Sequence, residues 1–301
     1  MTWDYFVYLS QNHNLREEET LPEGLASGFV DEVSVRFFTG NKEAARKRYM
    51  KVANKDFSIP QEIQHAEPDF SSLPSSRWLG LQVDFKLLTS WYSKDDRIFH
   101  VMDNPVRKDR ILGVPFMSPT SWKGLLRWAC RMREDLLEFL ESGKSFEKEW
   151  DEPPWILHLF GNPKEESENF HRGALVFYPT WFDRIGFEVI NPHRRATRAG
   201  TQPIYYEVVP PGAIGTLSLL YAPWPGIKPE ANPTEVLPKL LEAIEILLST
   251  YGISAKRTVG WGTARIEQWR AFHKKHDPVE KTQREELWEE IKDWLTEGGN
   301  S

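Results

Sequence analysis

The stretch Leu79-Gly-Leu-Gln-Val-Asp-Phe-Lys-Leu-Leu88 alternates apolar with polar side chains. Successive side chains of a β-strand point to opposite faces, so one face here is apolar and the other carries Gln82, Asp84 and Lys86. This pattern predicts a strand with one buried face.

The segments that follow predict a helix and then more strands. A helix is expected from about Pro119 or Thr120 to Leu140, because apolar residues recur at helical spacing and Ser118 or Thr120 can cap its start. The remaining expected elements, in order, are strands at 174–178, 204–209 and 215–221, a helix at 236–248 and a strand at 263–269. This order predicts an α+β fold with an antiparallel sheet, compatible with a ferredoxin-like βαββαβ unit.

The same patterns divide the chain into three consecutive segments. Residues 1–78 are expected to form an N-terminal extension and linker, with strands at 6–9 and 33–38, a basic helix at 41–52 and a loop at 57–76. Residues 79–270 are expected to form the main domain. Residues 271–301 are acidic and are expected to form a C-terminal tail with an amphipathic helix.

Composition excludes several classes of protein. The net charge is −6, so overall charge does not favour nucleic acid, and any such site must be a local patch. Cys130 is the only cysteine, which excludes an intramolecular disulfide and a cysteine zinc site. The N-terminus lacks a signal-peptide pattern and no apolar run is long enough to span a bilayer, so we expect a cytoplasmic protein without a membrane partner.

Residues 103–133 reverse the overall sign of the charge. They hold two acidic residues, Asp103 and Asp109, and seven basic ones: Arg107, Lys108, Arg110, Lys123, Arg127, Arg131 and Arg133. The N-terminus of a helix attracts anions, and Lys123, Arg127 and Arg131 lie four residues apart, so this patch suits a phosphate backbone. An ordinary capped helix with a solvated basic face explains it equally well.

Two later segments carry similar chemistry. The glycine-rich stretch 252–265 contains Lys256, Arg257, Gly260, Trp261 and Gly262, which supply cations, a stacking surface and room for close approach. Its spacing matches neither a Walker loop nor a dinucleotide-binding fingerprint, and a simple helix-to-strand turn would explain the glycines alone.

The other segment, 191–201, carries Arg194, Arg195 and Arg198 among small and hydroxylated residues, which suits phosphate contacts. Taken alone, it fits an ordinary surface loop better.

Candidate catalytic groups are few. The sequence has no HExxH motif and no firmly assignable metal ligands. Asp103 can act as a base or hold a divalent ion near a phosphate. It can equally be a turn residue that bonds to its own backbone.

Several motifs resemble those of the RAMP superfamily of CRISPR-associated proteins. They are Asp103-Asn-Pro-Val106 with Asp109, Gly113-Val-Pro-Phe116, Ser121-Trp-Lys-Gly-Leu-Leu-Arg127, Tyr206-Glu-Val-Val-Pro-Pro-Gly212 and the glycine-rich loop from Gly252 to Gly262. The resemblance covers roughly residues 79–270. It departs from the family pattern at Pro119-Thr120, where a Gly-Ser pair is usual.

The resemblance implies an RRM-like fold and a backbone subunit of a type III CRISPR effector complex. Such a subunit holds guide RNA phosphates, lies beside the paired target RNA and contacts other effector subunits. The resemblance carries over, position by position, to Asp103, Lys123, Arg127 and the loop at Gly260 and Gly262. Together with the cationic segments above, it leads us to expect RNA contacts from Arg107, Ser121, Lys123, Arg127, Arg131, Arg194, Arg195, Lys256, Arg257, Gly260, Trp261 and Gly262.

The resemblance leaves three functions open. RNA binding requires no cofactor. In cleaving subunits the residue matching Asp103 cuts target RNA with a divalent metal such as Mg²⁺. The segment 173–203 looks closer to the non-cleaving subunit that caps the filament. The alternatives to RNA binding alone are therefore a metal-dependent endoribonuclease and a subunit that mainly binds or caps other proteins.

Overall fold

The computed structural model describes most of the chain in several ranges: 42–56, 58–59, 61–64, 67–95, 100–109, 113–162, 171–192, 203–226 and 230–295. The chain divides into two compact units, each made of three separated segments. The first unit comprises Met1–Pro60, Tyr92–Phe116 and Phe182–Pro210. The second comprises Gln61–Trp91, Met117–Trp181 and Pro211–Ser301. Neither unit coincides with the three consecutive segments that the sequence suggested, because strands distant in sequence pair with one another.

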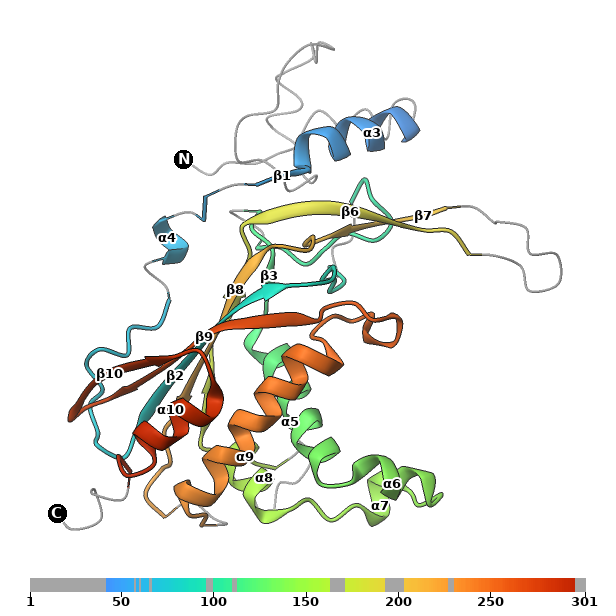
Figure 1. Ribbon diagram of the computed structural model, residues 1–301. Helices are drawn as coiled ribbons and strands as arrows, with labels where there is room; N and C mark the ends of the chain where they lie inside the picture. Colours follow the sequence, from blue (N-terminus) through green and yellow to red (C-terminus); the bar gives the residue numbers. More distant parts are fainter. Residues whose placement is uncertain are drawn as a thin grey trace, which may run out of the picture. The chain divides into compact units, whose positions relative to one another are not determined.

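The second unit is built on a five-stranded antiparallel sheet with the order β10-β9-β2-β8-β4 (Figure 1). Its strands are β2 (Leu79–Leu87), β4 (Leu175–Phe177), β8 (Ile214–Tyr221), β9 (Ala264–His273) and β10 (His276–Lys281). Helix α5 (Pro119–Arg133) connects β2 to β4, and α9 (Pro233–Ile246) connects β8 to β9. This βαββαβ order confirms the expected α+β, ferredoxin-like fold.

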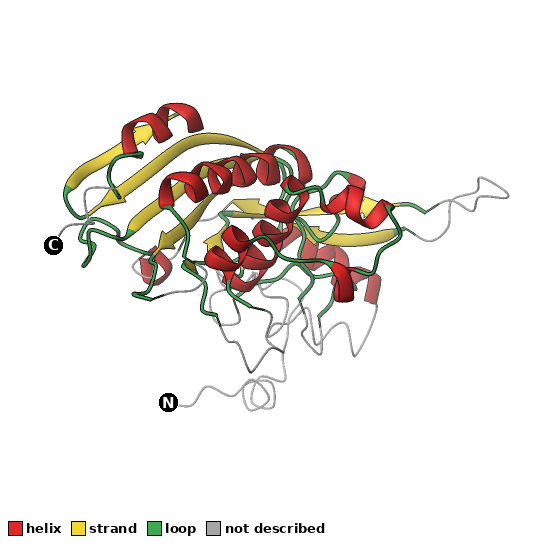
Figure 2. Ribbon diagram, turned by 90° about the horizontal axis from the view of Figure 1, so that it is seen from below, coloured by secondary structure: helices red, strands yellow, loops and turns green. Residues whose placement is uncertain are grey.

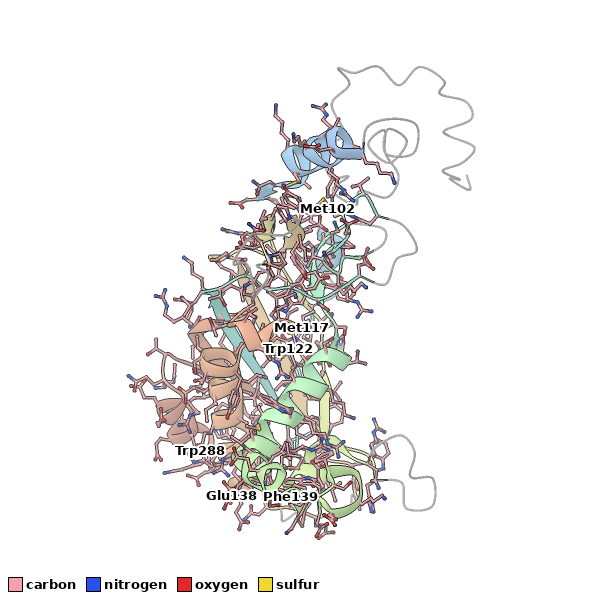
Figure 3. The ribbon with its side chains drawn as sticks, turned by 90° about the vertical axis from the view of Figure 1, so that its right-hand side faces the viewer. Met102, Met117, Trp122, Glu138, Phe139 and Trp288 are labelled. Atoms are coloured by element: carbon pink, nitrogen blue, oxygen red, sulfur yellow. The ribbon has the colours of Figure 1, made fainter. Side chains whose placement is uncertain are left out.

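One face of this sheet forms the main core with the two helices, which lie along it (Figure 2). Leu81, Val83 and Phe85 on β2 are buried, as their alternation predicted. Trp122 of α5 is fully buried, meets the Phe85 ring edge-on at 6.1 Å and donates a hydrogen bond from Nε1 to Thr180 Oγ1 at 2.9 Å. Figure 3 shows Trp122 close to the start of α5.

Residues 67–78 cover part of the opposite face of the sheet. Phe70 packs directly on Gly80 of β2 and clusters with Leu73 and Leu220. Beyond this cover the face carries a polar network, since Asp84 accepts hydrogen bonds from Thr216 Oγ1 at 2.7 Å and from Arg270 Nη2 at 2.8 Å. This face is therefore not an exposed aromatic platform.

The predicted helix that ran to Leu140 is wrong in its C-terminal part. α5 ends at Arg133. Asp135 then takes a left-handed conformation with φ 59°, and a right-handed helix cannot continue through such a residue. The chain then forms three short helices, α6 (Leu136–Glu141), α7 (Phe146–Glu149) and α8 (Pro154–Phe160). The sequence suggested one long helix because apolar residues continue past this break, and one of them, Leu136 of α6, is also buried.

The expected helical tail at 271–301 is also only partly correct. β9 extends to His273 and turns into β10, so residues 271–281 belong to a hairpin, which the backbone hydrogen bonds of the sheet stabilise. The helix that follows, α10 (Arg284–Ile291), is shorter than expected. Trp294 lies beyond it, where its ring stacks on His276 with the centroids 4.9 Å apart.

The first unit contains α3 (Lys42–Ala53) and a small antiparallel sheet with the order β1-β6-β7. Its strands are β1 (Lys55–Asp56), β6 (Arg184–Ile190) and β7 (Ile204–Val208). Tyr49 of α3 packs with Val101, Met102 and Ile185 in a buried cluster. The expected strands at 6–9 and 33–38 lie outside the described residues.

The remaining short elements are α4 (Gln61–Gln64), β3 (Phe116–Met117), β5 (Thr180–Trp181), a π-helical turn after α9 (Leu247–Tyr251) and a 3₁₀ turn (Arg257–Val259). Among the described residues, no helix has both the length and the apolar character needed to cross a bilayer.

Candidate nucleic-acid interface

The start of α5 is capped by a cluster of hydroxyl groups. Ser118 Oγ accepts a hydrogen bond from the Ser121 N–H at 3.2 Å and lies 3.0 Å from Thr120 Oγ1 and 2.9 Å from Ser121 Oγ. Pro119 occupies the first turn, where its missing N–H costs nothing. The first turn holds no acidic residue, so the positive end of the helix dipole is not neutralised there.

The arginines further along α5 are engaged within the chain. Arg127 Nη2 lies 3.2 Å from Glu152 Oε2, and Arg131 Nε donates to Glu152 Oε1 at 2.9 Å. Burial of Glu152 would by itself raise its pKa, but hydrogen bonds from Arg131 and Arg127 outweigh burial and lower the pKa. The two guanidinium groups and the one carboxylate together carry one net positive charge. The sequence had predicted a stripe of cations without this acidic partner.

The glycine-rich loop closes tightly on itself. The Ile253 N–H donates to the Gly262 carbonyl at 2.9 Å, and Trp91 Nε1 donates to the Ile253 carbonyl at 3.0 Å. Gly262 has φ 89°, and a Cβ there would overlap the backbone nitrogen of Ser254. Gly260 has φ 82° but is exposed, with open space where a Cβ would lie.

Arg257 joins this loop to α5. Its guanidinium carbon lies 4.2 Å from the centre of the Trp128 ring, and Trp128 in turn meets Tyr251 edge-on at 4.8 Å. Burial lowers the pKa of Arg257. Its Nη1 is buried and has no hydrogen-bond partner among the described residues. Tertiary packing therefore brings together two predicted RNA-contact segments that are distant in sequence.

The other site residues of this loop are accessible to different degrees. Lys256 and Trp261 are half-buried, and Gly260 is exposed. Lys123, on the first turns of α5, is also half-buried.

Asp103 and Arg107 belong to the first unit. The Asp103 side chain is 69% exposed and forms an ion pair with Arg46 Nη2 at 2.7 Å. Arg107 donates its backbone N–H to the Ser93 carbonyl at 2.8 Å and holds its guanidinium over the Phe116 ring at 5.9 Å. Arg194 and Arg195 lie outside the described residues.

A buried charge cluster fixes the segment between Asp103 and Asp109. Glu207 on β7 accepts hydrogen bonds from Lys108 Nζ at 2.6 Å, from the Val106 N–H at 3.0 Å and from the Tyr49 hydroxyl. Burial acts to raise the pKa of Glu207, but the charges of Lys108 and His100 and the hydrogen bonds lower it. The cluster therefore ties α3, β7 and the Asp103 segment into one unit.

Sequence patterns gave no role to three residues of these sites, namely Trp128, Glu152 and Glu207. Glu207 had the clearest available signal, because a lone carboxylate in the apolar strand Tyr205-Tyr-Glu-Val-Val209 needs a buried partner. Nothing in the local sequence indicates the partners of Trp128 or Glu152.

The residues described around Asp103 do not fit a resident divalent metal ion. The neighbouring Arg46 guanidinium competes with a cation for the carboxylate. Among the described residues, no group of three or more His, Cys, Asp or Glu side chains is placed to hold a metal.

Comparison with known proteins supports the class of fold and then identifies the family. The chain resembles a chain in the cryo-EM structure of the type III-B Cmr-beta complex bound to cognate target RNA, with a TM-score of 0.50 and 16% identity over 77% of this chain and 76% of that one. It also resembles a chain of the Csm3–Csm4 subcomplex of the type III-A CRISPR–Cas interference complex, with a TM-score of 0.44 and 16% identity over 71% and 94% of the two chains. A search of curated protein sequences gives no match.

The family model of the RAMP superfamily matches residues 84–265, which is more than half of the chain. The chain therefore belongs to the RAMP superfamily, as its motifs indicated.

The two loop glycines provide a matched pair of substitutions. Gly260→Ala should lower the free energy of unfolding by about 1 kcal/mol, because alanine is strained in the left-handed region. Gly262→Ala carries the same strain and also a backbone overlap, so it should cost at least about 1 kcal/mol more. Urea denaturation followed by fluorescence measures both losses. Equal losses would contradict the close approach at Gly262.

The Glu152 pair predicts a dependence of stability on pH. The folded-state pKa of Glu152 lies below its ordinary value, so its stabilisation is present above pH about 4.5 and is lost as the pH falls through the folded pKa. Glu152→Gln should cost about 1.5–3 kcal/mol at pH 7, and its difference from the wild type should shrink at lower pH. Thermal denaturation between pH 7 and pH 3 tests this. As a control, Glu267→Gln removes only an exposed partner of Arg265 and should have little effect.

Proposed function

We propose that this chain is an RNA-binding subunit of a type III CRISPR ribonucleoprotein that holds guide RNA and helps to position target RNA. Membership in the RAMP superfamily supports this proposal. So does the likeness in fold to a chain of a type III-B complex whose structure contains target RNA.

The observation that carries the proposal is the packing of the glycine-rich loop against α5 through Arg257 and Trp128. It places a half-buried guanidinium close in sequence to the exposed turn at Gly260. Guanidinium groups bind phosphate oxygens with well-defined geometry, and Arg257 is only half-buried, so an RNA phosphate is a suitable ligand for this side chain.

We propose contacts with guide RNA phosphates from this loop and from the start of α5. The contributing residues are Ser121, Lys123, Lys256, Arg257, Gly260 and Trp261, and the buried Gly262 shapes the loop. Further candidates are Arg127 and Arg131, which would first have to be released from Glu152, together with Arg107, Arg194 and Arg195. Because contacts with phosphates carry no sequence information, recognition should depend little on guide sequence.

The open face of the sheet is a less suitable RNA-binding surface than the glycine-rich loop. RRM domains stack bases on aromatic side chains of the open sheet face. Here residues 67–78 cover part of that face, and Asp84 lies on the remainder. Asp84 pairs with Arg270, so the two charges offset each other and offer a phosphate backbone little attraction, which favours the loop and the start of α5 as the RNA surface in this unit.

Removal of the loop cations should weaken RNA binding. Lys256→Gln with Arg257→Gln should reduce affinity for single-stranded guide RNA at least about tenfold. The slope of log K against log salt should flatten by about 1.4, because two phosphate contacts are lost. Fluorescence anisotropy over a salt series gives both values.

A matched control removes the same charge elsewhere in the second unit. Arg265 and Lys281 pair with Glu267 and Glu290, so Arg265→Gln with Lys281→Gln should leave the salt slope nearly unchanged. An equal change in both double variants would show only a general charge effect and would reject the proposed loop site.

A second candidate function is cleavage of target RNA at Asp103. The specific observation in its favour is an exposed carboxylate beside a guanidinium, since a carboxylate can accept a proton and an arginine can pair with a phosphate.

Asp103→Asn tests cleavage in the assembled complex with guide and target RNA. If Asp103 is catalytic, the cleavage rate should fall about 10²–10⁴-fold while target binding stays unchanged. Asp183→Asn, which removes another carboxylate paired with an arginine in the same unit, is the control. Undiminished cleavage rejects the role of Asp103, and a wild-type complex that does not cut at this subunit supports the non-cleaving, capping alternative.

A further inference from the structure

The short helices after α5 form a surface of their own in the second unit. The left-handed turn at Asp135 ends α5, and α6 and α7 then pack through a small aromatic cluster. Trp150 meets Phe139 edge-on at 5.1 Å and stacks on Phe146 at 5.9 Å. Figure 3 labels Glu138 and Phe139 of α6 in this region.

Two leucines on α6 are exposed. Leu137 and Leu140 are 54% and 46% exposed, whereas the adjacent Leu136 is buried. They are three residues apart on one helix, so they lie on the same side and make one continuous apolar contact. We call Leu137, Leu140 and the charged residues around them the α6 surface.

The charges around these leucines are mainly negative. Five exposed carboxylates flank them in sequence, on Asp135, Glu138, Glu141, Glu149 and Asp151. The lysines of this segment are Lys144 and Lys148, and the ammonium group of Lys144 lies 5.7 Å from the centre of the Phe139 ring. Such a surface repels RNA phosphates and attracts cationic groups.

We propose that the α6 surface is a docking site for a basic amphipathic segment of another protein. The partner presents apolar side chains one helical turn apart to Leu137 and Leu140, with lysines or arginines on both sides that face the carboxylates. Opposite charges at the rim steer and orient such a partner, and the leucines supply the apolar contact.

A second copy of this chain is a poorer occupant. If the same surface met itself across a two-fold axis, its carboxylates would face one another. The inference does not rest on RNA binding, because none of its residues belongs to the proposed RNA contacts.

A synthetic helical peptide serves as the probe for the full-length protein. It carries leucines one turn apart, lysines on both flanks and a fluorescent label. Wild-type protein should bind it with an affinity that falls as salt rises, and Leu137→Ser with Leu140→Ser should weaken binding at least about tenfold. Glu138→Gln with Glu141→Gln should weaken binding and flatten the salt dependence.

Two controls make the test specific. Leu88→Ser with Ile214→Ser changes equally exposed apolar residues elsewhere in the second unit and should not alter binding. A peptide with glutamates in place of its lysines should not bind.

Any of four results would overturn the proposal: no binding by the wild-type protein, equal losses in both serine double variants, binding of the glutamate peptide, or loss of RNA affinity in the Leu137 and Leu140 variant. Self-association in sedimentation velocity that depends on Leu137 and Leu140 would assign the surface to a second copy and would also overturn it.

Discussion

The pairing of β2 with two strands distant in sequence is the constraint on which the second unit depends. β2 bonds to β8 along one edge and to β9 along the other, so residues 79–87 align segments from the later part of the chain. The helix after β2 and the loop before β9 then lie against each other, as the contact of Trp128 with Arg257 shows. The candidate RNA surface is thus a consequence of strand order.

Compensation of charge within the chain decides which cations are available to a ligand. Glu152 engages Arg127 and Arg131, and Glu207 engages Lys108, although all three cations belong to the same basic stretch of sequence. Burying the ammonium of Lys108 would be costly without the Glu207 carboxylate beside it. Arg257 is different, because its guanidinium packs on the Trp128 ring and not against a carboxylate.

The second unit therefore presents two surfaces of opposite chemistry. The loop and the start of α5 combine cations with an uncompensated helix N-terminus, which suits a polyanion. The α6 surface combines exposed leucines with carboxylates, which suits a basic protein segment. This separation gives a physical reason why a protein with a net charge of −6 can carry an RNA site.

The sequence by itself determined the main strands and helices of the βαββαβ unit and their order, because the alternation in β2 and the helical spacing in α5 are local properties of side chains. The motifs also identified the family and the loop at Gly252–Gly262. Tertiary structure alone decided the partners of Arg127, Lys108 and Arg257, since each partner lies far away in sequence. It also decided the end of α5 at Asp135 and the β10 hairpin, because left-handed aspartate and strand pairing depend on surrounding contacts and not on local preference.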